Sequence, residues 1–184
     1  MLSGSGRTLA NLLNEIEEGR LDARVVLVIA STECLGARRA REQGIETLVV
    51  PGRIPGHDLG MILREREIDW VLLAGYLKKI EIPAGFEGRV VNIHPALLPK
   101  FGGEGMYGRH VHEAVLRAGE RESGCTVHLC DGEYDHGPVL LQMRCPVRPD
   151  DTPESLAAKV FELEREAYPE AVRRLLAGKG GRER

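Results

Sequence analysis

The sequence predicts an α/β protein: a Rossmann-like, mostly parallel twisted sheet with helices on both faces and an antiparallel C-terminal edge. Through the first two thirds of the chain, apolar runs typical of strands buried on both faces alternate with amphipathic helical patterns. Strands that alternate with helices indicate parallel pairing with right-handed crossovers. In the last third, two strand-like runs follow each other without a helix between them, which indicates antiparallel pairing.

The individual elements follow from the spacing of apolar residues and from the residues that end each run. Leucine and isoleucine side chains at helical intervals predict a first helix over 8–18. Because proline lacks an N–H group, Pro169 is expected to interrupt the last helix before it continues to Gly178. The other elements are expected as strand 25–29, helix 33–43, strand 47–50, helix 58–67, strand 70–74, strand 90–93, a helix holding 111–116, strands 126–129 and 139–147, and a last helix capped by Thr152.

The first strand of such a sheet is almost missing. Only Met1 and Leu2 precede a glycine-rich segment that normally follows a complete strand. That strand would lie centrally, between the strands centred on Leu27 and Leu72, where each unpaired buried backbone group costs about 1–3 kcal/mol. We therefore expect either that residues before Met1 exist in the natural protein or that residues 1–3 fill the position minimally, and we favour the first.

Length and composition bound the domain organisation. The chain has 184 residues, of which 42% are hydrophobic and 29% charged, as in ordinary soluble globular domains. Since a domain typically has about 100–200 residues, we expect one domain over 1–184, with its first strand cut short and a frayed tail at 179–184.

The same composition excludes several classes of function. A net charge of −3 gives no field that would collect nucleic acid, and no apolar run approaches the roughly 18 residues of a membrane span. No secretory signal is visible and the four cysteines form no CxxC pair, so a cytoplasmic location and free thiols are expected. We expect small-molecule partners, no nucleic acid and no membrane, and a monomer or homodimer.

A glycine-rich motif opens directly into the first predicted helix. Its glycines let backbone N–H groups approach an anion, and the helix N-terminus favours negative charge, so a monophosphate is the natural ligand. The motif is neither a full dinucleotide fingerprint nor a Walker A loop, and a plain glycine-rich turn explains it equally well. It consists of Ser3, Gly4, Ser5, Gly6, Arg7 and Thr8.

Two further motifs place polar groups at strand ends. Asn92 and His94 alternate to one face at the carboxyl end of a predicted parallel strand, which is where open α/β sheets hold their sites. An amide and an imidazole on one face suit an oxyanion, although a structural histidine is an equal alternative. Asp135 lies on a turn after a later strand and could orient or deprotonate a partner, although turn formation is the commoner use of aspartate.

Metal binding is not expected. His110 and His112 are two residues apart on a predicted helix, so their side chains point in different directions. Cys125 and Cys130 are odd-spaced along a strand and face opposite sides, which disfavours a zinc site.

Taken together, these motifs resemble the folate-dependent formyltransferases, most closely the branch that acts on glycinamide ribonucleotide in purine biosynthesis. The matching segments run in family order along nearly the whole chain, and the Asn-x-His-Pro run with the later Asp-x-Gly-Pro run is highly specific. They are Leu2–Gly6, Leu73–Tyr76, Asn92–Pro99, Gly124–His128, Asp135–Gln142 and Glu164–Pro169.

The resemblance implies a formyltransferase fold and a set of site residues. Asn92, His94 and Asp135 match the catalytic trio, with Thr126 and His128 beside it. The glycine-rich motif matches the segment that holds the substrate phosphate, and Glu164 matches a position contacting the ribonucleotide. Residues matching the folate pocket are Tyr76, Leu77, Lys78, Lys79, Ile80, Asp131, Gly132, Glu133 and Tyr134.

The implied reaction moves a formyl group from the co-substrate 10-formyltetrahydrofolate to a primary amine, with no metal. A tetrahedral intermediate would carry an oxyanion, to which Asn92 and a protonated His94 could donate. Asp135, as a carboxylate, would favour the imidazolium and help to move a proton, with water as a conceivable relay.

Departures from the family pattern leave alternatives open. Thr8 stands where the family often has asparagine, and the usual aromatic-Pro-Gly is replaced by Phe101-Gly102-Gly103, extended by 104–108. Because that stretch would border the ribonucleotide, a sibling enzyme acting on another phosphorylated amine, such as an amino-sugar nucleotide, is one alternative. A non-catalytic phosphate-binding module and a metal hydrolase are the others.

Overall fold

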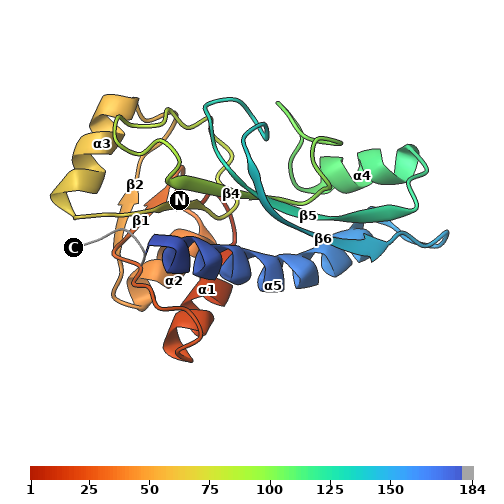
Figure 1. The fold of residues 1–184 in the computed structure, drawn as a ribbon, viewed down its shortest axis with the longest axis horizontal. Coiled ribbons are helices and arrows are strands. Elements are labelled where there is room, and N and C mark those ends of the chain that lie inside the picture. The colour runs from red at the N-terminus through yellow and green to blue at the C-terminus, as the bar shows by residue number, and fades with distance from the viewer. Residues whose placement is uncertain (180–184) are drawn as a thin grey trace.

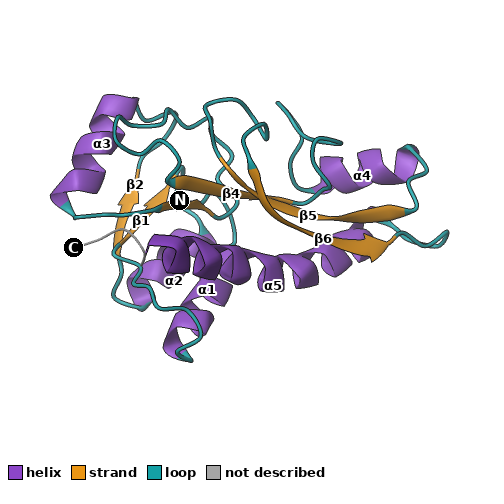
Figure 2. Ribbon diagram, in the orientation of Figure 1, coloured by secondary structure: helices purple, strands orange, loops and turns teal. Residues whose placement is uncertain are grey.

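A twisted sheet runs through the protein, with helices against both of its faces (Figures 1 and 2). The computed structural model describes residues 1–179. Its elements are α1 (Arg7–Glu17), β1 (Leu27–Ala30), α2 (Leu35–Glu42), β2 (Glu46–Val49), α3 (Gly56–Glu65), β3 (Val71–Leu73), β4 (Val90–His94), α4 (Arg109–Arg117), β5 (Glu122–Leu129), β6 (Val139–Pro146) and α5 (Pro153–Lys179).

Strand pairing divides the sheet into a parallel and an antiparallel part. β1 pairs with β2 in parallel, and β3 pairs with β4 in parallel. β4 then pairs antiparallel with β5, and β5 antiparallel with β6. The predicted fold class, with helices on both faces and an antiparallel C-terminal edge, is confirmed.

The chain before the glycine-rich motif joins the two parallel pairs. Leu2 N donates to Ile29 O at 3.0 Å, and Ser31 N donates to Leu2 O at the same distance. On the other side, Ala74 N donates to Met1 O at 2.8 Å. Leu2 is almost fully buried between β1 and β3. Residues 1–3 therefore occupy the central position between β1 and β3 in a minimal form.

Helices α1, α2 and α5 cover one face of the sheet. Leu12 of α1 joins Leu156 and Tyr168 of α5 in one buried cluster with Val91 of β4 and Val127 of β5. This cluster fixes α5 across the strands that carry the polar residues of interest.

Helix α3 covers the opposite face. Leu59 and Leu63 of α3 pack with Ile29 of β1, Val71 of β3 and Val90 of β4. Because β4 contributes side chains to both clusters, its position is determined from two sides, and so are the polar side chains at its carboxyl end.

The last helix does not break at proline, so the predicted interruption at Pro169 is wrong. α5 runs continuously from Pro153 to Lys179 with Pro169 inside it. The missing N–H of Pro169 leaves the carbonyl of Arg165 without its helical donor. Asn11 of α1 supplies one instead, since its Nδ2 donates to Arg165 O at 2.9 Å. A side chain from the first helix thus compensates a proline in the last.

Two findings concern the ends of the chain and its surface. The predicted frayed tail at 179–184 lies, beyond Lys179, outside the described residues. Over the described part of the chain, no helix is both long and apolar enough to cross a bilayer.

Candidate active site

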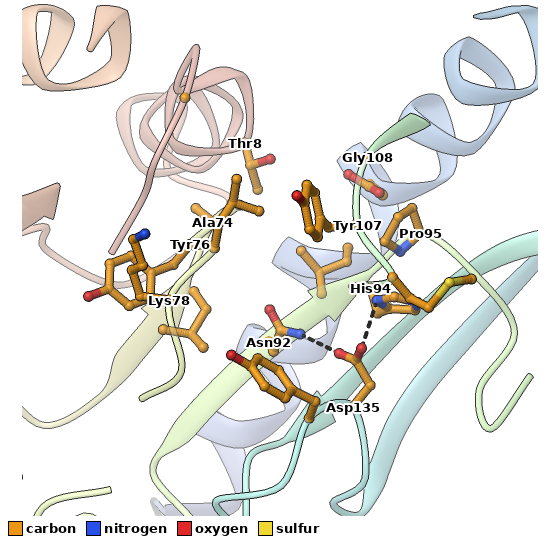
Figure 3. A pocket seen from close by; sticks show the side chains of 18 of the residues that line it. Thr8, Ala74, Tyr76, Lys78, Asn92, His94, Pro95, Tyr107, Gly108 and Asp135 are labelled. Atoms are coloured by element: carbon orange, nitrogen blue, oxygen red, sulfur yellow. Dashed lines mark hydrogen bonds and ion pairs between the residues drawn. The ribbon is translucent and has the colours of Figure 1, made fainter. Parts of the chain in front are cut away.

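A cavity of about 720 Å³ opens at the carboxyl ends of β3 and β4 (Figure 3). The glycine-rich motif borders it, together with the segments after β3 and β4, the loop between β5 and β6, and the first half of α5. Such a position, beyond the carboxyl ends of parallel strands, is where doubly wound sheets bind their ligands.

Asn92, His94 and Asp135 meet in this cavity, as predicted. Asn92 Nδ2 donates to Asp135 Oδ1 at 3.3 Å, although the two residues are 43 positions apart. His94 Nδ1 lies 3.3 Å from Asp135 Oδ2. Figure 3 shows both contacts and the Asn92 amide oxygen turned away from Asp135.

The backbone explains this convergence. Asn92 and His94 lie on one face of β4, where β5 pairs opposite them. Asp135 comes from the loop after β5 and has φ of 53°, a left-handed conformation uncommon for a residue with a Cβ. Gly103 N donates to Asp135 Oδ2 at 3.0 Å, which fixes the carboxylate toward the imidazole.

Acceptor groups face both nitrogens of His94. Nε2 lies 2.7 Å from the carbonyl oxygen of Phe101, so Nε2 carries a hydrogen and donates it. The Asp135 carboxylate faces Nδ1. Burial lowers the pKa of His94 and outweighs the opposite effects of Asp135 and the Phe101 carbonyl, which favour the imidazolium, so the net shift is downward.

The carboxylate of Asp135 is held in its charged form. Burial raises the pKa of Asp135, but His128, His94 and the hydrogen bond from Gly103 N together lower it by more, so the net shift is downward. A stable anion beside His94 is the arrangement that orients an imidazole and stabilises its positive charge.

Two residues of β5 hold Asn92 and the segment after β4 in place. His128 Nδ1 donates to Leu129 O at 3.0 Å, which leaves Nε2 to accept from Asn92 Nδ2 at 3.1 Å. Thr126 Oγ1 donates to Ala96 O at 2.6 Å and so ties the segment after β4 to β5. Both were expected beside Asn92 and His94, and they lie opposite these residues in the β4–β5 pairing.

The glycine-rich motif forms the opposite wall of the cavity. Gly6, with φ of 74°, is the N-cap of α1, and a Cβ there would lie 2.6 Å from the Cα of Gly36. Gly4, Ser5, Gly6, Arg7 and Thr8 line the cavity, but Ser3 does not. The Ser3 hydroxyl instead accepts hydrogen bonds from Ser31 Oγ at 2.6 Å and from Leu77 N at 2.9 Å. Ser3 therefore holds the motif against its neighbours.

Arg7 lies over an aromatic ring from α5. Its guanidinium carbon is 4.2 Å from the centroid of the Phe161 ring. Glu164, one helical turn further along α5, also lines the cavity. Burial raises the pKa of Glu164 to about 7, and the positive charge of Arg7 opposes that shift.

The two segments expected at the folate pocket face each other. Residues 76–80 and 132–134 line the cavity, and Lys79 Nζ lies 5.8 Å from the centroid of the Tyr134 ring. Asp131 does not line the cavity. Its carboxylate accepts from Glu133 N at 3.1 Å and pairs with His136 Nδ1 at 2.6 Å, so it shapes the turn.

A family model described as formyl transferase matches residues 1–172. The chain belongs to the formyl transferase family.

Known formyl transferases resemble this chain over nearly all of its length. It is 43% identical over 181 residues to "Phosphoribosylglycinamide formyltransferase, chloroplastic" from Arabidopsis thaliana. The aligned region covers 93% of this chain and 62% of that protein. The glycinamide ribonucleotide transformylase 1 structure from Symbiobacterium toebii is 34% identical with a TM-score of 0.88, covering 96% of this chain and 85% of that one. The phosphoribosylglycinamide formyltransferase structure from Bacillus halodurans is 30% identical with a TM-score of 0.86, covering 95% and 92%.

The chain spans less than two thirds of the length of its plant relatives, 62% for Arabidopsis thaliana and 59% for Vigna unguiculata. Within residues 1–179 there is no group of three or more His, Cys, Asp or Glu side chains that could hold a metal ion.

Several residues of this formyl transferase line the cavity without having been predicted. Phe161 could have been found from the sequence, because it lies three positions before Glu164 and so shares its helix face. The others depend on how α4 and the preceding loop fold against α5. They include Arg109 and His112. Met106, Tyr107 and Gly108 also line the cavity, and they belong to the stretch 101–108 that was expected to border the ribonucleotide.

Proposed function

We propose that this chain transfers the formyl group of 10-formyltetrahydrofolate to the primary amine of glycinamide ribonucleotide in purine biosynthesis. The observation that carries the proposal is the meeting of Asn92, His94 and Asp135 in a cavity that also contains the glycine-rich motif. The printed names of the relatives support it, since they are phosphoribosylglycinamide formyltransferases.

The cavity offers room and chemistry for two substrates. Its volume of about 720 Å³ lies within the range of small-molecule sites. Asn92, His94 and Asp135 form what we call the catalytic end. Gly4–Thr8, with Phe161 and Glu164, forms what we call the acceptor end.

The acceptor end suits a ribosyl phosphate. Backbone N–H groups at the start of α1 and the guanidinium of Arg7 would hold the phosphate. Glu164 would accept hydrogen bonds from the ribose hydroxyls. The folate would lie between segments 76–80 and 132–134, where Lys78 and Lys79 would meet its carboxylates and Tyr76 and Tyr134 would pack on its rings.

The catalytic end suits the developing negative charge on the formyl oxygen. His94 donates through Nε2, and Asp135 at Nδ1 stabilises the imidazolium form. A positive charge on His94 would therefore stand where the oxyanion forms. The amide nitrogen of Asn92 donates to Asp135 and His128, so it does not serve the oxyanion as the sequence led us to expect. Its oxygen is instead available to accept a hydrogen bond from the attacking amine.

The bond changes balance without a metal or a covalent enzyme intermediate. A bond forms between the acceptor nitrogen and the formyl carbon, and the bond from that carbon to the folate nitrogen breaks. One proton leaves the acceptor amine and one reaches the folate nitrogen. Asp135 and His94 are the groups placed to move it, directly or through water.

We further infer that the whole of 1–184 acts as one catalytic domain on small molecules in the cytoplasm, as a monomer or homodimer. The departures at 101–108 keep a sibling activity on another phosphorylated amine as the alternative acceptor chemistry.

An assay of formyl transfer tests the proposal. The purified protein is mixed with 10-formyltetrahydrofolate and glycinamide ribonucleotide, with an amino-sugar nucleotide and water as competing acceptors. We expect turnover with glycinamide ribonucleotide only. Turnover with the amino-sugar nucleotide alone would assign the sibling activity, and no turnover with any amine would contradict a transferase.

A further inference from the structure

One histidine of the cavity wall has no role in the site described so far. His112 of α4 is 4% exposed and lines the cavity, yet its Nδ1 atom is fully buried without a hydrogen-bond partner among residues 1–179. A buried, unpaired polar atom costs about 1–3 kcal/mol, so an imidazole at this place calls for an explanation. Its neighbour on the same helix, His110, is 62% exposed and so faces away.

The position of His112 relates it to the acceptor. α4 begins at Arg109, directly after Tyr107 and Gly108, and in Figure 3 Tyr107 lies between Thr8 of the glycine-rich motif and His94. His112 is close enough to His94 for a charge on that ring to oppose its protonation. His112 therefore borders the stretch between the phosphate-binding wall and the catalytic end.

The chemistry of the ring selects the group it would bind. Burial and His94 both lower the pKa of His112, so the ring is neutral and carries one N–H. Orphaned N–H groups are rarer in proteins than orphaned acceptors, which places that hydrogen on Nε2 and leaves the buried Nδ1 bare. The ring then offers a single neutral N–H donor, which suits a carbonyl oxygen, because the phosphate would already be held by the backbone N–H groups at the start of α1 and by Arg7.

We propose that His112 is an acceptor-specificity residue whose Nε2 donates a hydrogen bond to the carboxamide oxygen of the acceptor. This rests on the proposed function, because glycinamide ribonucleotide carries a carboxamide between its ribosyl phosphate and its primary amine. The bond fixes the middle of the acceptor and so directs its amine at the formyl carbon. An amine acceptor without a carboxamide would leave His112 unpaired and bind more weakly.

Four variants of α4 test the proposal. His112→Leu replaces the imidazole by an apolar group of similar size. His112→Gln puts an amide N–H near the place of Nε2, and His112→Asn puts one near the place of Nδ1. His110→Leu is the matched control, since it changes the exposed histidine of the same helix. Each protein is measured by thermal unfolding, by the KM for both substrates, and by calorimetric binding of glycinamide ribonucleotide alone.

We expect His112→Leu to raise the acceptor KM and dissociation constant about three- to tenfold, the effect of one lost hydrogen bond. Its KM for 10-formyltetrahydrofolate should stay unchanged, and its unfolding temperature should be equal or higher, because an unpaired buried atom has been removed. His112→Gln should recover most of the affinity, His112→Asn little of it, and His110→Leu should behave as wild type.

Three results would overturn the inference. An unchanged acceptor KM in His112→Leu, with wild-type transfer intact, would leave the proposed function standing and remove His112 from it. Recovery by asparagine and not by glutamine would refute the assignment to Nε2. If the wild-type protein neither binds nor formylates glycinamide ribonucleotide, the proposed function fails and this inference fails with it.

Discussion

The two ends of the cavity differ in how many of their polar groups already have hydrogen-bond partners within the protein. At the catalytic end, Asn92, His94 and Asp135 are all bonded to one another or to backbone groups. At the acceptor end, Glu164 is buried enough to raise its pKa to about 7. The difference teaches that the catalytic end is organised before substrate arrives, whereas the acceptor end depends on the ligand for its partners.

The largest effect is expected at the catalytic end. Asp135→Asn removes the charge that stabilises the His94 imidazolium while keeping the side-chain shape, so kcat should fall about 100- to 10,000-fold. The KM for glycinamide ribonucleotide should change little, because no residue of the acceptor end is altered. Steady-state kinetics measure both values. A large rise in KM with kcat preserved would erase the distinction between the two ends.

The next largest effect is expected at Arg7, whose guanidinium lies over the Phe161 ring. Arg7→Ala should raise the acceptor KM roughly tenfold, since a charge-assisted contact to the phosphate is lost, and should weaken competition by inorganic phosphate. Arg38→Ala on α2 is the control for net charge. Equal effects of the two substitutions would show that only the overall field matters and that Arg7 has no particular place in the acceptor end.

Glu164 should give a pH-dependent effect. Its pKa is raised from 4.5 to about 7 by burial, so folding favours the protonated carboxyl. That contribution is fully present below pH 4.5 and is lost as pH rises through about 7, with at most about 3 kcal/mol involved. Denaturant unfolding of wild type and Glu164→Gln between pH 4 and pH 8 measures it.

In that comparison, the wild type should lose stability over the interval relative to Glu164→Gln. Parallel stability curves for the two proteins would contradict the burial of this carboxyl. With acceptor bound the dependence should shrink, because the ligand supplies the partners that the free acceptor end lacks.

The smallest effect is expected away from both ends. Asn11→Ala removes the donor to Arg165 O and should lower the free energy of unfolding by about 0.5–1.5 kcal/mol, with catalysis nearly unchanged. Asn14→Ala, at an exposed position of the same helix, is the control. If Asn11→Ala raises the acceptor KM instead, the α1–α5 contact belongs to the acceptor end.

Much of the fold could be predicted because it depends on local periodicity. The strand runs around Leu27 and Leu72 and the change to antiparallel pairing after α4 are all visible in the sequence. The continuity of α5 through Pro169 could not be predicted, because the compensating donor, Asn11, lies 154 positions from Arg165. Sequence spacing carries no information about such a contact.

The site divides in the same way. Asn92 and His94 could be placed from one strand, since alternation along β4 puts them on one face. Ser3 and Asp131 were expected with the cavity-lining residues, but their side chains serve the turns that hold those residues. From the sequence, His112 was considered only as a metal ligand and rejected. Its place in the cavity wall could not be predicted, because it depends on the packing of α4.

The carbonyl of Phe101 on His94 Nε2 has a thermodynamic consequence for the proposed reaction. To engage the formyl oxygen of the substrate, this N–H must exchange one neutral carbonyl for another, and such an exchange gains almost nothing. Exchanging the same carbonyl for a negatively charged oxygen is favourable, because hydrogen bonds to ions are roughly twice as strong. The hydrogen bond lost to the carbonyl of residue 101 thus offsets the one gained to the neutral formyl oxygen of the bound substrate. His94 therefore lowers the barrier of the reaction and does not tighten the Michaelis complex.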